Sequence, residues 1–116
     1  FGWCYYFQKA ELARQFKQWD EVVSLGDAAF AEGLSPADPS ERFVFIEGYA
    51  HAGEWDRAVE LSMQSFDESE LMSPPLCRLW ERVESETAPS PGRAALGEPK
   101  RSEALSEAQT MLTCNP

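Results

Sequence analysis

Residues 18–30 read QWDEVVSLGDAAF, and residues 54–66 read EWDRAVELSMQSF. Both stretches place Trp and Asp at the head of an apolar run. When residues 7–30 are aligned on residues 43–66, seven positions are identical, whereas unrelated sequences would share about one or two. The identical pairs are Phe7/Phe43, Glu11/Glu47, Trp19/Trp55, Asp20/Asp56, Val23/Val59, Leu25/Leu61 and Phe30/Phe66. The chain therefore contains an internal repeat with an offset of 36 residues.

Apolar residues recur at helical spacing in the first copy of the repeat. No Pro or Gly interrupts residues 3–18, and Tyr6, Ala10 and Ala13 share one helical face. A second helix is expected from about Asp20, whose charge suits the positive end of a helix, up to Gly33. The first copy thus predicts two consecutive helices.

The second copy has a clear helix start. Asp38 can cap a helix whose first position is taken by Pro39, and this third helix is expected to end at Gly53. A fourth helix follows over about 55–66, and a fifth, announced by consecutive prolines, covers 75–86.

The remainder of the chain differs in composition. Residues 87–101 are rich in Pro, Gly and Ala and predict a long loop or flexible linker. A last helix over 102–114 carries a narrow apolar stripe of Leu105, Ala108 and Leu112. No segment has the pattern of a strand, so we expect an all-α fold of about five or six helices, arranged as antiparallel hairpins.

The second copy resembles the tetratricopeptide repeat (TPR), a helix–turn–helix unit of usually about 34 residues. The resemblance rests on residues 48–61, GYAHAGEWDRAVEL. It implies that Gly53 makes the tight turn between the helices and that Trp55 wedges against a neighbouring helix. It also implies that Ala58 is small because two helices approach closely there.

The first copy departs from this pattern, because Lys17 stands at the position of the turn glycine and Val22 at that of the small alanine. The resemblance nevertheless implies a short TPR-like solenoid, since a single hairpin cannot bury its apolar face alone. The expected parts are residues 1–86 as helical repeats, with units at about 3–34 and 39–70 plus a helix at 75–86, a loop at 87–101, and a capping helix at 102–114.

The family resemblance also implies a concave groove lined by the first helix of each unit. Carried over residue by residue, the groove positions are Phe7, Glu11, Arg14, Gln15, Phe43, Glu47 and His51. Two aromatics and two carboxylates would suit a basic or amide-rich peptide. The alternative is that Glu11 and Glu47 are solvated surface residues with Arg14 as their ion partner. Some family members hold a partner's terminal carboxylate with basic groove residues, but Phe and Glu occupy most of those places here, so carboxylate clamping is not expected.

Catalytic and metal chemistry have little support in the sequence. His51 is the only histidine, and no second histidine or cysteine lies at ligand spacing from it, so neither a metal nor another cofactor is expected. Glu11 and Glu47 could form a carboxylate pair like that of glycosidases, but nothing indicates a deep pocket around them. We therefore expect no enzymatic activity.

Charge and hydropathy narrow the class of partner further. A formal net charge of −10 disfavours nucleic acids and anionic lipids. No apolar run reaches the roughly 18–20 residues of a membrane-spanning helix, so this segment is not expected to insert into a membrane.

The chain opens with FGWCYYF and no initiator Met, which suggests a fragment of a longer polypeptide. Residues 3–15, WCYYFQKAELARQ, also look like the start of helical-repeat domains at the C-terminal ends of some bacterial membrane proteins. The localisation stays open: a soluble segment is expected, and attachment to a membrane-embedded parent is the alternative that this resemblance implies.

Three cysteines, Cys4, Cys77 and Cys114, lie far apart and form no C-x-x-C pair. We expect buried free thiols that behave as small apolar residues. A bridge between Cys4 and Cys114 in an oxidising compartment is the alternative.

Two functions follow as expectations. The first is a non-catalytic interaction or scaffold module that presents a concave helical surface to a protein or peptide. The alternative is a structural accessory segment that packs on the rest of a larger protein and binds no separate ligand. Exposed side chains at Phe7 or Phe43 would favour the groove, whereas an exposed apolar patch at the N-terminus or along the last helix, or self-association there, would favour the accessory role.

Overall fold

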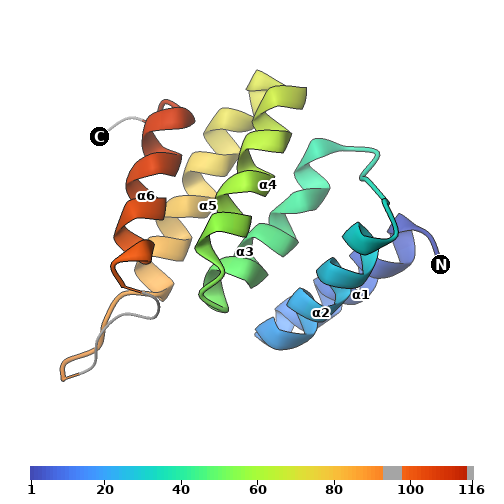
Figure 1. Cartoon of the computed structure of the whole chain (residues 1–116), viewed down its shortest axis with the longest axis horizontal. Coiled ribbons are helices and arrows are strands. Elements are labelled where there is room, and N and C mark those ends of the chain that lie inside the picture. The colour runs from blue at the N-terminus through green and yellow to red at the C-terminus, as the bar shows by residue number, and fades with distance from the viewer. Residues whose placement is uncertain (93–97, 115–116) are drawn as a thin grey trace.

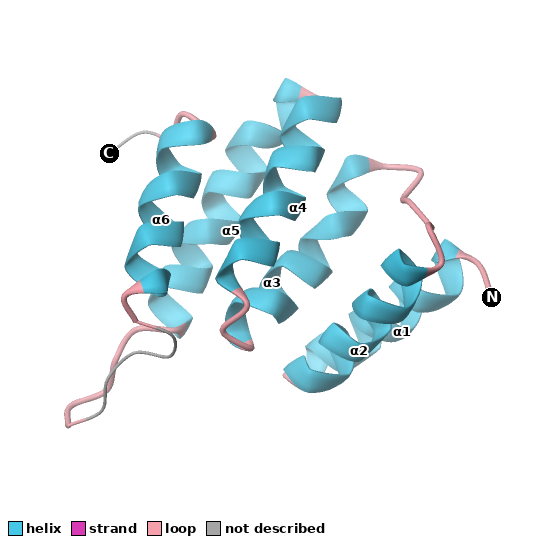
Figure 2. Cartoon of the chain, viewed as in Figure 1, coloured by secondary structure: helices cyan, strands magenta, loops and turns pink. Residues whose placement is uncertain are grey.

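A computed structural model describes residues 1–92 and 98–114 of the chain, and these residues form helices and turns without any strand (Figures 1 and 2). The prediction of an all-α fold is therefore confirmed. The α-helices are α1 (Trp3–Gln15), α2 (Trp19–Ala31), α3 (Phe43–His51), α4 (Trp55–Glu68), α5 (Ser73–Glu86) and α6 (Lys100–Met111), and the short 3-10 helices are η1 (Pro39–Arg42) and η2 (Glu70–Met72). The predicted loop at 87–101 is described only in part, because residues 93–97 lie outside the described residues.

Helix α2 packs on α1 and α3, and α3 also packs on α1, α4 and α5. Helix α6 packs on α4 and α5. Figure 1 shows α1 and α2 at one end of the array and α6 at the other. The array measures 42 × 30 × 21 Å along its principal axes.

The turns inside the first two hairpins have the same geometry at the offset of the repeat. Lys17 and Gly53 both adopt the left-handed conformation, with φ of 54° and 81°. In the first turn the Gln18 N–H donates to the Ala13 carbonyl oxygen at 3.0 Å, and in the second the Glu54 N–H donates to the Tyr49 carbonyl oxygen at 2.8 Å. A lysine therefore makes the turn for which the other copy uses glycine, although this conformation costs roughly 1–2 kcal/mol in a residue with a side chain.

Two glycines allow α2 and α3 to approach closely. A Cβ atom added to Gly48 would lie 2.4 Å from Val22 Cγ1, and one added to Gly26 would lie 2.9 Å from Phe45 Cδ1. The bulk of Val22, which replaces the small alanine of the second copy, is thus accommodated by Gly48 on the facing helix.

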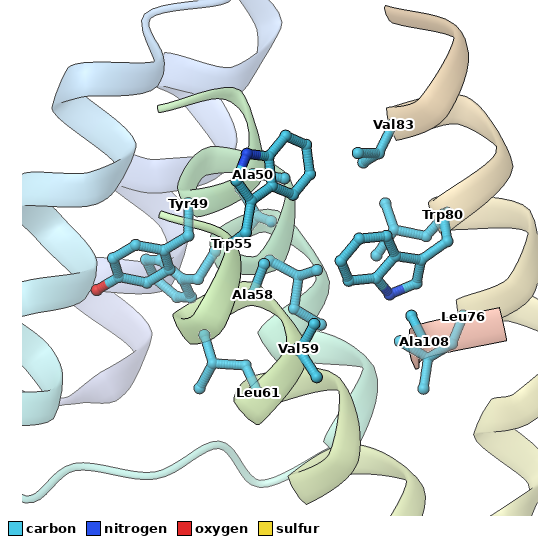
Figure 3. Close-up of a cluster of buried hydrophobic side chains, with 14 of the residues drawn as sticks. Tyr49, Ala50, Trp55, Ala58, Val59, Leu61, Leu76, Trp80, Val83 and Ala108 are labelled. Carbon is cyan, nitrogen blue, oxygen red and sulfur yellow. The ribbon is translucent and has the colours of Figure 1, made fainter. Parts of the chain in front are cut away.

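The centre of the core lies between α3, α4 and α5 (Figure 3). Trp55 of α4 and Trp80 of α5 are 1% and 0% exposed, and their ring centroids are 6.4 Å apart. The Trp80 indole N–H donates to Ser62 Oγ at 2.9 Å, and the Ser62 hydroxyl donates in turn to the Ala58 carbonyl at 2.9 Å. Both buried polar groups are therefore satisfied, as burial requires.

Helix α6 begins two residues before the predicted helix and is fastened to α5 at both ends. Near its start the buried Arg101 donates through Nη2 to the Glu84 carbonyl at 2.7 Å and through Nε to Thr87 Oγ1 at 3.0 Å. Near its end the Ser73 hydroxyl donates to the Leu112 carbonyl at 2.6 Å. Because the start of each helix meets the end of the other, α5 and α6 run antiparallel.

This arrangement overturns the expectations for the cysteines. Cys77 and Cys114 form a disulfide with a Cα–Cα distance of 5.6 Å, whereas Cys4 is free and exposed. The prediction of buried free thiols was wrong for all three cysteines, because two of them are bonded to each other and Cys4, although free, is exposed. The alternative Cys4–Cys114 bridge was also wrong. The physical reason is the antiparallel return of α6 along α5, which brings together two cysteines 37 residues apart in sequence.

The cap predicted at Asp38 is present. Its carboxylate accepts from the Ser40 N–H at 2.9 Å and the Ser40 hydroxyl at 2.7 Å, and these hydrogen bonds lower the pKa of Asp38. The first turn, with Pro39 at its head, is a 3-10 helix, and the α-helix proper begins only at Phe43.

Candidate functional site

A network of charged side chains joins α1 and α3, which carry most of the groove residues predicted from the sequence, to α5, which carries none of them. Its centre is Glu47 on α3, whose Oε1 atom accepts from Arg14 Nε at 2.7 Å and from Arg82 Nη2 at 2.9 Å. The Glu47 side chain is only 4% exposed, whereas those of Arg14 and Arg82 are 37% and 43% exposed. A buried carboxylate is thus neutralised by one guanidinium group from each neighbouring helix.

The position of α3 in the array explains this pairing. Because α3 lies between α1 and α5, a side chain on its groove face meets both neighbours. Arg14 lies in the last turn of α1, and its hydrogen bond to Glu47 raises the pKa of its guanidinium above the usual value. Glu11 adds to this effect through its charge, so it lies near the network even though it is not bonded to Arg14.

One helical turn beyond Glu47, His51 links the same helices to the start of α2. Its Nε2 atom lies 2.9 Å from Glu86 Oε1 on α5. The Trp19 ring stacks on the His51 ring, with centroids 4.2 Å apart and planes inclined by 9°. Trp19 therefore forms an aromatic wall at one end of the network.

Two hollows lie beside this wall. One, of about 200 Å³, is lined by Arg14, Gln15, Lys17, Trp19, Glu47 and Glu86. The other, of about 550 Å³, is lined by Lys17, Gln18, Trp19, Asp20, Glu21 and His51. Because Lys17 and Trp19 line both, the recess is centred on the turn between α1 and α2.

The structure brings together only part of the predicted groove set. Arg14, Glu47 and His51 belong to the network, and Gln15 lines the adjoining hollow. Phe7 and Phe43 are half-buried and pack against the hydrophobic core.

The structure also corrects the interpretation of the carboxylates. In the alternative interpretation, Glu11 and Glu47 are solvated surface residues with Arg14 as their ion partner. Arg14 does pair with Glu47, but Glu47 is not solvated, because its side chain is only 4% exposed. Its bonded oxygen is already engaged by arginines, which leaves it poorly placed to hold a basic ligand.

Sequence reasoning missed three neighbours of the site, namely Arg82, Glu86 and Trp19. Arg82 and Glu86 lie 35 residues after their partners Glu47 and His51. This spacing nearly equals the offset of the repeat, so extending the alignment into a third unit would have placed them on the same face.

Glu47, His51 and Glu86 also form a candidate ligand set for a divalent cation, because they offer ligand atoms that all lie within 4.8 Å of one another. Carboxylate oxygens and an imidazole nitrogen are ligands for zinc and related ions. However, Glu47 is balanced by two guanidinium groups and Glu86 already contacts His51. The absence of a metal site, expected from the sequence, stays a prediction.

Comparison of the chain with protein-family models, curated proteins and solved structures returned no match. Within the described residues, none of the helices has the length and apolar character needed to cross a lipid bilayer. The site must therefore be interpreted from its own geometry.

Proposed function

We propose that this chain is a non-catalytic protein-interaction module that presents the α1–α3–α5 surface to a peptide or protein. One observation carries the proposal: Glu47 holds two arginines from neighbouring helices in fixed positions while more than a third of each arginine side chain stays exposed. Such prepositioned donors beside a hollow lose little conformational entropy when they bind a ligand.

A short TPR-like solenoid is the architecture that we propose for this module. The matching turns at Lys17 and Gly53 support it, because the two hairpins reverse direction in the same way. The tryptophans support it as well, since each begins the second helix of a hairpin and contacts the next hairpin, Trp19 at His51 and Trp55 at Trp80. Stacking of this kind would place the first helices of successive units on one surface.

The contacts of Glu47 change the expected chemistry of the ligand. Its Oε1 atom accepts from Arg14 and Arg82, so this oxygen is not free to hold a basic ligand, and the groove offers donors from these arginines and from Lys17. The ligand that fits is an extended peptide segment with backbone carbonyls or acidic side chains facing the arginines. An apolar side chain of the ligand would lie against Trp19.

The non-catalytic part of the proposal rests on the same contacts. Glu47, the more buried carboxylate of the Glu11 and Glu47 pair, uses its bonded oxygen to position two arginines. We infer that it has a structural role in the groove and does not transfer protons.

A selected peptide ligand tests the proposal. Peptides of about 12 residues, long enough to span a groove of this kind, would be selected by phage display against the full chain. Binding would then be mapped by amide chemical shifts. We expect the largest shifts at Arg14, Trp19 and His51, and Lys17→Glu should weaken binding about tenfold because it reverses a charge at the recess.

Lys9→Glu is the matched control, because Lys9 is also an exposed lysine but does not line either hollow at the α1–α2 turn. Selected peptides whose shifts map away from the groove, or that bind equally to both variants, would contradict the proposal.

A structural accessory role is the second candidate function. It is favoured by the half-burial of Phe7 and Phe43 together with large apolar side chains exposed elsewhere on α1. In that case the selection should yield no groove-binding peptide.

A further inference from the structure

An apolar stripe of four side chains runs along the outer face of α1 and the residues at its two ends, and nothing in the described structure covers it. Phe1, Tyr5, Leu12 and Phe16 are 84%, 36%, 57% and 68% exposed. Successive members are four, seven and four residues apart, a spacing that places them along one side of the helix, and the Phe1 ring stacks on Tyr5 with centroids 4.1 Å apart. Single exposed apolar residues are normal, but a row of four along one helix and its two ends indicates an interaction surface.

The corresponding face of α3 shows what kind of surface fits there. At the offset of the repeat, Lys9 and Leu12 correspond to Phe45 and Gly48. Phe45 is fully buried, and Gly48 packs closely against Val22 of the preceding helix α2. The exposed face of α1 therefore corresponds to the face of α3 that packs on α2, the second helix of the preceding hairpin.

At the opposite end of the array lies α6, which packs on α4 and α5 and has no further described helix on its outer face. Figure 1 shows α6 at the far end from α1. Its outer face has a shallow hollow lined by Ser102, Glu103, Ser106, Glu107, Thr110 and Met111. Three of these are short side chains one helical turn apart, which leaves room for large side chains from another helix.

The charged residues beside the two surfaces indicate which surface of a second copy packs on the α1 stripe. Lys9 is the charged residue beside the stripe, whereas the α6 hollow carries the exposed acids Glu103 and Glu107. Contact between the α1 stripes of two copies would bring Lys9 near its own counterpart. Contact between α1 and α6 pairs a cation with anions, which favours this orientation in a chain whose net charge is −10.

We propose that α1 of one copy docks on α6 of a second copy, with Tyr5, Leu12 and Phe16 over the short side chains of α6 and Lys9 facing Glu107. The surface is independent of the groove proposed above. Because such a head-to-tail contact is not closed by a two-fold axis, it continues from copy to copy. One helix face offers less than the roughly 800 Å² per partner of a stable complex, so we expect a dissociation constant on the order of 100 µM.

Sedimentation equilibrium of the full chain, from about 10 µM to about 1 mM, tests this contact around the expected dissociation constant. The mass of the wild type should rise with concentration and exceed that of a dimer. Leu12→Glu on α1 and Ser106→Arg on α6 should each stay monomeric, and circular dichroism should show unchanged helix content, because both positions are exposed. Leu71→Glu is the control, since Leu71 is 81% exposed but lies on neither surface, and it should associate like the wild type.

Mixing the two monomeric variants gives the most specific readout. Leu12→Glu retains an intact α6 and Ser106→Arg an intact α1, so the mixture should form a one-to-one dimer and nothing larger. Lys9→Glu should weaken the contact about two- to fivefold, and combination with Glu107→Lys should restore it.

Three results would overturn the proposal. The wild type could stay monomeric at the highest concentration. The Ser106→Arg variant could associate like the wild type, which would indicate contact between two α1 stripes. The mixture of the two variants could remain monomeric.

Discussion

The hairpins α1–α2 and α3–α4 share a sequence pattern and a turn, yet they differ in what surrounds them. The α3–α4 hairpin has neighbours on both sides, and its Trp55 is 1% exposed. Among the described helices, only α3 packs on the α1–α2 hairpin from outside it, and Trp19 of this hairpin is half-buried against His51. The repeated residues therefore define the shape of a hairpin, whereas the neighbouring helices determine how much each residue contributes to stability.

The largest difference should appear when the two tryptophans are truncated. Trp55→Ala removes a fully buried ring beside Trp80 and should cost about 3–5 kcal/mol, whereas Trp19→Ala should cost about 1 kcal/mol because its ring is partly solvated. Urea unfolding followed by circular dichroism measures both losses. Equal losses would show that the two positions are energetically equivalent.

The glycine contact between the hairpins gives the next effect. Gly48→Ala places a Cβ atom 2.4 Å from Val22 Cγ1 and should destabilise the fold by about 1–3 kcal/mol. Val22→Ala should recover part of this loss in the double variant, because it removes the clashing methyl groups. Gly2→Ala is the control, since a Cβ atom there meets nothing within 4 Å. A double variant as unstable as the sum of the single variants would refute the contact.

Substitutions of the left-handed turn residues Lys17 and Gly53 should change the stability of the chain in opposite directions. Lys17→Gly relieves a left-handed lysine and should stabilise the chain by about 1 kcal/mol, whereas Gly53→Ala should destabilise it by a similar amount. Lys17→Ala separates the loss of charge from the backbone effect, because alanine keeps the strain. Thermal unfolding would measure these shifts, and stabilisation by alanine equal to that by glycine would exclude the backbone explanation.

The smallest effect concerns Tyr49, which occupies the place of Ala13 in the first hairpin. Burial and the 2.6 Å hydrogen bond from its hydroxyl to Asp27 raise the pKa of Tyr49 above the ordinary value of 10.0. The contribution of Tyr49 to the free energy of unfolding is complete below about pH 10. It is lost as the pH rises further, because the Tyr49 hydroxyl loses its proton readily there only in the unfolded chain. The loss at about pH 10.5 should stay below about 1 kcal/mol.

Tyr49→Phe should flatten this alkaline loss in urea unfolding measured at several pH values. Tyr6→Phe, in the first hairpin, should leave most of it in place. A Tyr49→Phe variant with the same pH dependence as the wild type would contradict the assignment.

Local patterns were enough to predict the helices and the repeat. Turn signals such as Gly53 and the capping residue Asp38 act within a few residues of chain, so the sequence shows them directly. The α-helical start at Phe43 was missed, because whether a first turn is 3-10 or α depends on the contacts of the helix.

The contacts of the site could be predicted only in part. Arg14 and Glu47 face each other as the groove pattern implied, but Arg82 comes from a helix with no full copy of the repeat. The Cys77–Cys114 bond could not be deduced either, because any pairing among three cysteines depends on how α6 returns along α5.

The bond between Cys77 and Cys114 makes the last third of the molecule a covalent ring. A protease that cuts the backbone within that ring would leave one connected molecule until a reductant separates the pieces. Mechanical tension applied to the chain beyond Cys114 would likewise pass directly into α5, so α6 would carry no load.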